Sequence, residues 1–160
     1  MPKKTRSLSC LGLILIFIPI TCLIAQEERI IHVRYDSSRC DYCRMLFQER
    51  KFGGELQTAN DSILVFDASE CQAAFLIAGK IPETQVKNIW SVNYLTPGIL
   101  VDAHKAWYLR CDKIMSPMEA NIAAFNSKEE ADSVRSALGG DILTWEGVIS
   151  LIRNRWFPKK

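Results

Sequence analysis

Short apolar runs separated by turn residues divide most of the chain into alternating strands and helices. The β-branched run at residues 62–66 and the alternating run at residues 89–95 predict two strands. The apolar segment between them predicts a helix that Asp67 caps and that stops at Gly79. A further strand is expected over residues 44–54, where the chain reaches a pair of glycines.

The second half of the chain repeats the same order of elements. Phe66 and Phe125 each end a strand, and a capping residue, a helix and a glycine stop follow both of them. Asn126 or Ser127 caps the second helix. The elements expected in this half are strands at 99–101, 106–110, 122–125 and 141–145, and helices at 128–138 and 148–153. The pattern indicates an α+β fold with an internal repeat, unless the likeness is coincidence between common local patterns.

The first 25 residues have the pattern of an export signal. A basic start is followed by an uncharged run from Ser7 to Ala25, which ends in a small residue where a signal peptidase would cut. Two alternatives remain open: the segment stays as a membrane anchor, although Pro19 interrupts it, or Cys22 is lipidated. Each places the rest of the chain in the periplasm or anchored facing it. The expected boundaries are 1–25 for the signal, 26–39 for a tether and 40–160 for the domain, with halves at about 40–97 and 98–160.

Composition excludes a disordered chain and argues against nucleic-acid binding. Hydrophobic residues make up 48% of the chain and charged residues 24%, which is enough apolar surface for a folded core. The formal net charge of the whole chain is +2, and the predicted signal removes basic residues but no acidic ones. The exported part is therefore close to neutral and lacks the basic face that a nucleic-acid partner requires.

Cysteine spacing gives the first candidate for chemistry. The cysteines are Cys10 and Cys22 in the predicted signal, then Cys40, Cys43, Cys71 and Cys111 in the domain. In an oxidising compartment, the domain cysteines suggest two disulfides by default. One pairing joins Cys40 to Cys43 and Cys71 to Cys111, and the sequence does not choose among pairings. The Cys-x-x-Cys spacing of the first two indicates metal or thiol chemistry instead.

Soft sulfur donors near this pair favour monovalent copper. Cys40, Cys43 and Met45 place two thiols and a thioether close together, a set that suits Cu(I) better than zinc, which rarely recruits methionine. Met118 follows a Ser-Pro turn that could hold its side chain in one orientation, although a methionine that fills a core gap is the ordinary case. Cys71, in the first turn of the predicted helix, is a third sulfur ligand, a disulfide partner or a small buried residue.

The remaining residues form no recognisable catalytic set. His32 and His104 are the only histidines, and both are expected at the surface. Their scarcity argues against a histidine-rich zinc or Cu(II) site. The sequence contains no hydrolytic triad, phosphate loop or dinucleotide fingerprint. We therefore expect a binding protein and not an enzyme.

A series of short motifs runs in order through nearly the whole exported chain. They are CDYCRM at 40–45, LVFDASEC at 64–71, WSVNY at 90–94, VDAHKAWY at 101–108, SPM at 116–118, AAFNS at 123–127 and GG at 139–140. Together these motifs resemble those of the NosL family, exported copper-binding accessory proteins of nitrous oxide reductase.

The resemblance implies a fold of two β-β-α-β repeats, similar to the small fold of organomercurial lyase. It also implies Cu(I) binding and delivery of copper to a periplasmic enzyme, nitrous oxide reductase. Lipid anchoring is common in the family, which favours lipid at Cys22. The copper ligands that the motif positions imply are Cys40, Cys43, Met45, Met118 and Cys71.

The chain departs from the family pattern beside both candidate methionines. The family usually has glycine at the positions of Arg44 and Glu119. It often has aspartate at the position of Asn93, and methionine at that of Gln72, directly after the helix cysteine. These departures bear on the identity of the client enzyme and on the ligand set.

Two other functions remain open. One is an exported thiol–disulfide oxidoreductase that uses Cys40 and Cys43, although such enzymes place the pair at a helix N-terminus after a long strand. The other is a zinc-bound or disulfide-stapled module, with all the domain cysteines as its sulfur set. Methionine substitutions separate these functions, because they reduce copper binding but leave thiol redox chemistry unchanged.

Overall fold

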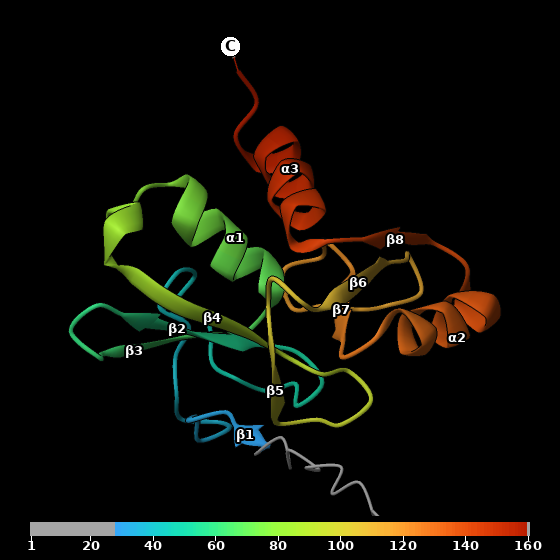
Figure 1. Ribbon diagram of the computed structural model, residues 1–160, viewed down its shortest axis with the longest axis horizontal. Helices are drawn as coiled ribbons and strands as arrows, with labels where there is room; N and C mark the ends of the chain where they lie inside the picture. Colours follow the sequence, from blue (N-terminus) through green and yellow to red (C-terminus); the bar gives the residue numbers. More distant parts are fainter. Residues whose placement is uncertain (1–27, 160) are drawn as a thin grey trace, which may run out of the picture.

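The computed structural model describes residues 28–159, which fold into two antiparallel sheets with helices packed on them (Figure 1). The first sheet has the strand order β1 (Arg29–Ile30), β5 (Ile99–Asp102), β4 (Val86–Val92), β2 (Gly54–Thr58) and β3 (Ile63–Phe66). The second has the order β7 (Ile122–Phe125), β6 (Trp107–Arg110) and β8 (Asp141–Leu143). The helices are α1 (Ser69–Ile77), the short 3-10 helix η1 (Glu83–Gln85), α2 (Lys128–Leu138) and α3 (Trp145–Trp156).

The two halves of the chain share one topology. In the first half, β2 lies between β3 and β4 and is antiparallel to both, and α1 connects those two outer strands. In the second half, β6 lies between β7 and β8 in the same way, and α2 makes the connection. Phe66 and Phe125 end corresponding strands, β3 and β7. The structure therefore confirms the predicted α+β fold with two β-β-α-β repeats.

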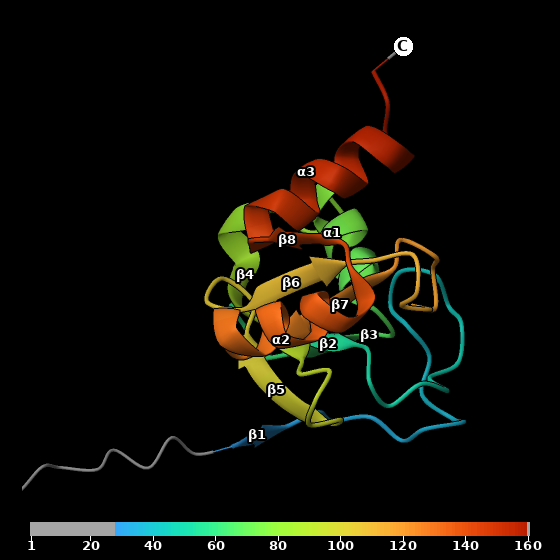
Figure 2. The same cartoon turned by 90° about the vertical axis from the view of Figure 1, so that its right-hand side faces the viewer.

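The halves are joined by hydrogen bonds and by a common core. Just after β4, the Tyr94 backbone N–H donates to the Ala124 carbonyl at 2.8 Å. The Tyr108 hydroxyl lies 3.0 Å from Ser91 Oγ, and it donates to the Ala103 carbonyl at 3.1 Å. The helices α1 and α3 lie side by side (Figure 1), while α2 packs against the three-stranded sheet (Figure 2). One hydrophobic cluster contains residues from both halves, so neither half buries its apolar surface alone.

Most predicted elements are confirmed, because local signals set their ends. Residues 122–125 and 128–138 form a strand and a helix as expected, and Ser127 caps the helix. β4 is shifted toward the N-terminus relative to the predicted run. α3 is longer than expected: Thr144 caps it, so Trp145, expected in a strand, begins the helix.

Two features predicted near the cysteine pair are wrong. Residues 44–54 do not form a strand, because Arg44 has a left-handed backbone (φ 67°) and β2 begins only at the end of this range. Asp67 does not cap α1. The N-cap is Ala68, which offers no side-chain hydrogen bond, and Asp67 instead contacts Cys43.

The described part of the predicted tether contacts the first sheet. β1 pairs with β5, and Ile31 is buried in the core. Glu55, on β2, is fully buried; it accepts a hydrogen bond from Arg29 Nη2 at 3.1 Å and lies 2.9 Å from His32 Nδ1. The predicted signal lies outside the described residues. Within the part that the structure describes, none of the helices has the length and apolar character needed to cross a membrane.

Candidate metal centre

Three thiols and one carboxylate lie together where the loop before β2 meets the first turn of α1. The Sγ atoms of Cys40, Cys43 and Cys71 and a carboxylate oxygen of Asp67 all lie within 4.8 Å of one another. We call these four groups the thiol cluster. Cys43 is half-buried, whereas the other three residues are buried. The cluster is therefore enclosed by protein and meets solvent on the side of Cys43.

A tight reversal of the chain brings Cys40 and Cys43 to the cluster. In this cysteine turn (residues 40–46), the Cys40 N–H donates to the Met45 carbonyl at 2.9 Å, and the Arg44 N–H donates to the Cys40 carbonyl at 3.0 Å. The left-handed backbone of Arg44 allows the chain to double back within so few residues. Both thiols are therefore held by backbone hydrogen bonds and not only by packing.

Asp41 attaches the cysteine turn to the edge of the first sheet. Its N–H donates to the Val65 carbonyl at 2.8 Å, and its Oδ2 accepts the Val65 N–H at 2.7 Å. Val65 lies on β3, the outermost strand on that side, so Asp41 satisfies backbone groups that would otherwise be unpaired. This contact places the turn beside the connection from β3 to α1, where Asp67 and Cys71 lie.

The first turn of α1 presents Cys71 to the cluster and the next residue to the sheet. Gln72 is fully buried, and its Nε2 donates to the carbonyls of Glu55 at 3.1 Å and Trp90 at 2.9 Å. Gly54 makes room for this amide, since a Cβ there would lie 2.4 Å from Gln72 Oε1. Gln72, where the family often has methionine, thus contacts the sheet and not the thiol cluster.

Hydrogen bonding and burial give the three thiols different acidities. A hydrogen bond from the Cys71 side chain lowers the pKa of Cys40, against the opposing effect of burial. The same hydrogen bond, together with burial, raises the pKa of Cys71. Burial raises the pKa of Cys43 to about 12. Of the three thiols, the surroundings therefore favour ionisation of Cys40 and disfavour that of Cys43 and Cys71.

Asp67 is the member of the cluster that the sequence did not reveal as a site residue. Its Oδ2 accepts a hydrogen bond from Cys43 Sγ at 3.4 Å, and its Oδ1 has no hydrogen-bond partner among the described residues. From the sequence, Asp67 was interpreted as a helix cap. Its contact with Cys43 could not be predicted, because the two residues are far apart in the chain. The available signal was its place one helical turn before Cys71, on the same strand–helix connection.

The two candidate methionines lie in different surroundings. Met45 belongs to the cysteine turn and is half exposed. Met118 is partly buried and packs against the core cluster that contains Cys40 and Cys71. Met115, in the same loop as Met118, is 76% exposed. The structure thus brings the three cysteines together, places Met45 in the same turn as two of them, and places Met118 against the core cluster.

The fourth cysteine of the domain is not part of the cluster. Cys111 is buried in the second hydrophobic cluster, and its Sγ donates to the Leu138 carbonyl at 3.4 Å. The hypothesis of a site made by all the domain cysteines is therefore wrong, and Asp67 occupies the fourth place. The described cysteines are free thiols, so the default pairing into disulfides is not observed either. His32 and His104 lie at the surface, as expected.

The unexpected residues beside the methionines share a backbone conformation. Arg44 and Glu119 have φ of 67° and 58°, in the left-handed region that favours glycine. The glycines that the family usually has at these positions would therefore allow the left-handed backbone conformation. Replacing it does not remove a donor atom from the site.

The arrangement suits a soft metal ion better than disulfide exchange. Several sulfur atoms within reach of one ion are the donors that Cu(I) and zinc accept. Cys40 and Cys43 lie in a turn, and the thiol in the first turn of a helix is that of Cys71. A thiol–disulfide oxidoreductase has its Cys-x-x-Cys pair at the helix start, so the geometry favours a metal centre.

Known proteins offer two points of comparison. The NosL family model matches residues 33–151 of the chain. The crystal structure of the copper chaperone NosL from Shewanella denitrificans shares the fold, with a TM-score of 0.60 and 20% sequence identity, over 74% of this chain and 95% of that chain. No curated protein matches the chain. Because the family model covers well over half of its length, this chain belongs to the NosL family.

Proposed function

We propose that this protein is an exported Cu(I)-binding protein that delivers copper to a periplasmic enzyme, in the maturation of nitrous oxide reductase. The observation that carries the proposal is the thiol cluster, in which the sulfur atoms of Cys40, Cys43 and Cys71 lie within 4.8 Å of one another. Membership of the NosL family supports it, as does the structural relative, which is described as a copper chaperone.

The proposed ligands are the sulfur atoms of the cluster and of its two neighbouring methionines. Thiolates neutralise the charge of the ion, and thioethers add soft donors that need no deprotonation. Asp67 is a hard oxygen donor, so we assign it to hydrogen bonding with Cys43 and not to copper ligation. The proposed set is Cys40, Cys43, Cys71, Met45 and Met118.

Unequal burial of these ligands supports a route for release. Cys40 and Cys71 hold the ion from the inner side, while Cys43 and Met45 lie toward solvent. A thiolate or imidazole of the partner can enter a coordination position on the outer side before the inner ligands leave. The protein moves an ion and makes or breaks no covalent bond of a substrate, so we propose that it is not an enzyme.

Copper binding is tested by anaerobic titration of the reduced protein with Cu(I), in competition with a colorimetric chelator. We expect one tightly bound Cu(I) per chain and an affinity at least about tenfold lower in Cys40→Ser, Met45→Ala or Met118→Ala. Cys111→Ser and Met115→Ala are matched controls outside the proposed set and should bind as the unaltered protein does. Failure to compete with the chelator, or equal retention of zinc, would contradict the proposal.

Delivery needs a separate measurement. Cu(I)-loaded protein is mixed with copper-free nitrous oxide reductase, and reductase activity is followed over time. We expect activity to return faster than with an equal concentration of Cu(I) held by a small-molecule chelator of similar affinity. Equal rates from the two donors would mean that copper dissociates before capture, which contradicts directed transfer.

We also propose that residues 1–25 direct export to the periplasm, where the protein is either released by cleavage of this segment or held at the membrane by a lipid on Cys22. The basic start and apolar run of this segment support export. With a lipid on Cys22, Cys22→Ser should move the protein from the membrane fraction to the soluble periplasm, and Cys10→Ser should not. A wild-type protein found in the soluble periplasm would contradict the anchor, and one found in the cytoplasm would contradict export.

A further inference from the structure

Glu70 is a buried acid that copper ligation does not use. It lies in the first turn of α1, directly before Cys71, and is fully buried. Its Oε1 accepts a hydrogen bond from the Ser116 hydroxyl, and the Ala120 backbone also hydrogen-bonds to it. Burying a carboxylate is costly unless hydrogen bonds compensate, so this contact is a specific one and not incidental packing.

Ser116 organises the loop that carries the second candidate methionine. We call residues 111–121, between β6 and β7, the methionine loop. Ser116 Oγ accepts the Asn121 N–H at 2.8 Å, and the Ser116 carbonyl accepts the Glu119 N–H at 3.0 Å. The second bond closes a turn with Pro117 and Met118 at its centre. A single serine therefore fixes both the turn and its return to β7.

The contact between Glu70 and Ser116 connects the two halves of the fold through the residue that precedes Cys71. Glu70 belongs to the helix of the first repeat, next to Cys71, and Ser116 belongs to the loop of the second repeat. Met118 packs on the core cluster that contains Cys71, whereas Met115, on the other side of Ser116, is 76% exposed. The loop that this contact holds thus has one methionine packed on the core and one exposed to solvent.

We propose that Glu70 and Ser116 are positioning residues that hold the Met118 thioether at the thiol cluster, so that copper binding draws on both repeats. The inference rests on the proposed copper function and deepens it. Neither residue needs to touch the ion. Their role is to fix the backbone from which the Met118 side chain extends, which lowers the entropic cost of ligation.

A double-mutant cycle between Ser116 and Met118 tests this role, with Cu(I) affinity as the readout. We expect Ser116→Ala and Met118→Ala each to lower the affinity about tenfold, as loss of a supporting residue does in other metal sites. The double variant should be no weaker than either single variant, because Ser116 acts only through Met118. Copper X-ray absorption should show one sulfur neighbour fewer in both single variants, a change that general loosening of the fold would not produce.

Matched variants separate positioning from folding. Ser116→Thr keeps the hydroxyl and Glu70→Gln keeps the Oε1 acceptor, so both should retain the affinity and sulfur count of the unaltered protein. Met115→Ala and Ser136→Ala, at exposed positions, should change neither. Additive losses in the cycle, or an unchanged sulfur count in Ser116→Ala, would overturn the inference while leaving the copper function standing. An unaltered protein that binds no Cu(I) would overturn both.

Discussion

Two residues with left-handed backbones flank the methionines proposed as ligands. Arg44 precedes Met45 and Glu119 follows Met118, and both have positive φ. Such a conformation costs a non-glycine residue about 1–2 kcal/mol. Each candidate methionine therefore has a neighbour in an unfavourable backbone conformation. The interactions of the surrounding turn must offset this cost in free energy.

Relief of this cost is measurable at Arg44. Arg44→Gly should raise the free energy of unfolding by up to about 1 kcal/mol, since the gain at positive φ exceeds the extra entropy that glycine loses on folding. The ion pair of Arg44 with Asp41, at 3.6 Å and exposed, contributes little. Urea unfolding should show a higher midpoint at unchanged slope.

The control for this measurement lies in the same segment. Gln48 is exposed and has no positive φ. Gln48→Gly should therefore lower the stability by about 0.5–1 kcal/mol. Equal effects of the two substitutions would show that the backbone of Arg44 is not strained.

Site residues could be predicted from the sequence only where the donor side chains lie close together along the chain. Cys40, Cys43 and Met45 stand out because their spacing alone gathers soft donors. Cys71 was a candidate with several explanations, and the structure places its free thiol beside those of Cys40 and Cys43. Asp67 was missed as a site residue because its partner is distant in sequence and because aspartate before a helix has an ordinary structural meaning.

At the scale of elements, the position of the cysteine turn depends on one edge strand. The turn has no regular secondary structure of its own, and Asp41 pairs it with β3 through two hydrogen bonds. β3 in turn leads directly to α1. The thiols of the turn and the thiol of the helix therefore share a single support, and loss of that support should separate them.

Substitution of Asp41 tests this dependence. Asp41→Ala should lower the free energy of unfolding by about 1.5–3 kcal/mol, because the Val65 N–H loses a charged acceptor. Cu(I) affinity should fall as well, although Asp41 is not a proposed ligand. Asp41→Asn keeps an acceptor oxygen and should recover most of both quantities, whereas Glu49→Ala, an exposed change nearby, should affect neither. Unaltered copper affinity in a folded Asp41→Ala protein would show that the turn holds its shape alone.

Elements were easier to predict than the way they meet. The repeat could be found because a glycine follows each helix, Gly79 after α1 and Gly139 after α2, although only α2 has the side-chain cap that was expected of both. The absence of a strand over residues 44–54 could not be predicted, because the composition of that segment does not reveal its left-handed turn. The pairing of β1 with β5 was also missed, since it joins a polar segment to a strand of the opposite half.

At the scale of the whole molecule, the thiol cluster joins parts of the chain that are far apart in the sequence. Cys40 and Cys43 come from a turn, and Cys71 comes from the helix beyond two intervening strands. An ion bound by all three cysteines closes a loop that the unfolded chain cannot close without loss of entropy. Copper binding should therefore raise the free energy of unfolding of the protein.

Thermal unfolding with and without one equivalent of Cu(I), under anaerobic conditions, measures this effect. A ligand at about 100 times its Kd adds about 2.7 kcal/mol when only the folded state binds it. In Cys71→Ser, the pair Cys40 and Cys43 still binds copper locally, in the unfolded chain too, so most of the rise in Tm should disappear. Cys111→Ala, outside the cluster, should keep the full rise relative to its own copper-free form. An equal rise in Cys71→Ser would show that the helix thiol is not a ligand.

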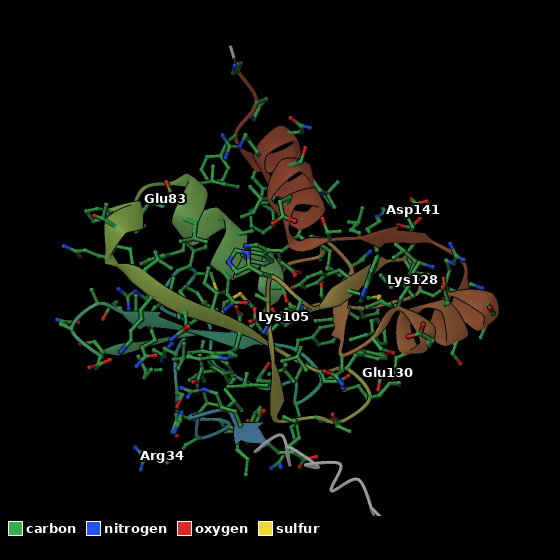
Figure 3. The ribbon with its side chains drawn as sticks, viewed as in Figure 1. Arg34, Glu83, Lys105, Lys128, Glu130 and Asp141 are labelled. Atoms are coloured by element: carbon green, nitrogen blue, oxygen red, sulfur yellow. The ribbon has the colours of Figure 1, made fainter. Side chains whose placement is uncertain are left out.

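The two repeats share a topology but differ at the start of their helices. At the start of α2, Ser127 and Glu130 both cap the helix: Ser127 Oγ accepts the Glu130 N–H, and the Glu130 carboxylate (Figure 3) accepts the N–H of Asn126, the residue before the N-cap, at 2.9 Å. The corresponding residues at the start of α1 are Ala68 and Cys71, and that helix has no side-chain cap. The same position of the repeat therefore stabilises the helix start in the second half and supplies a thiol of the cluster in the first.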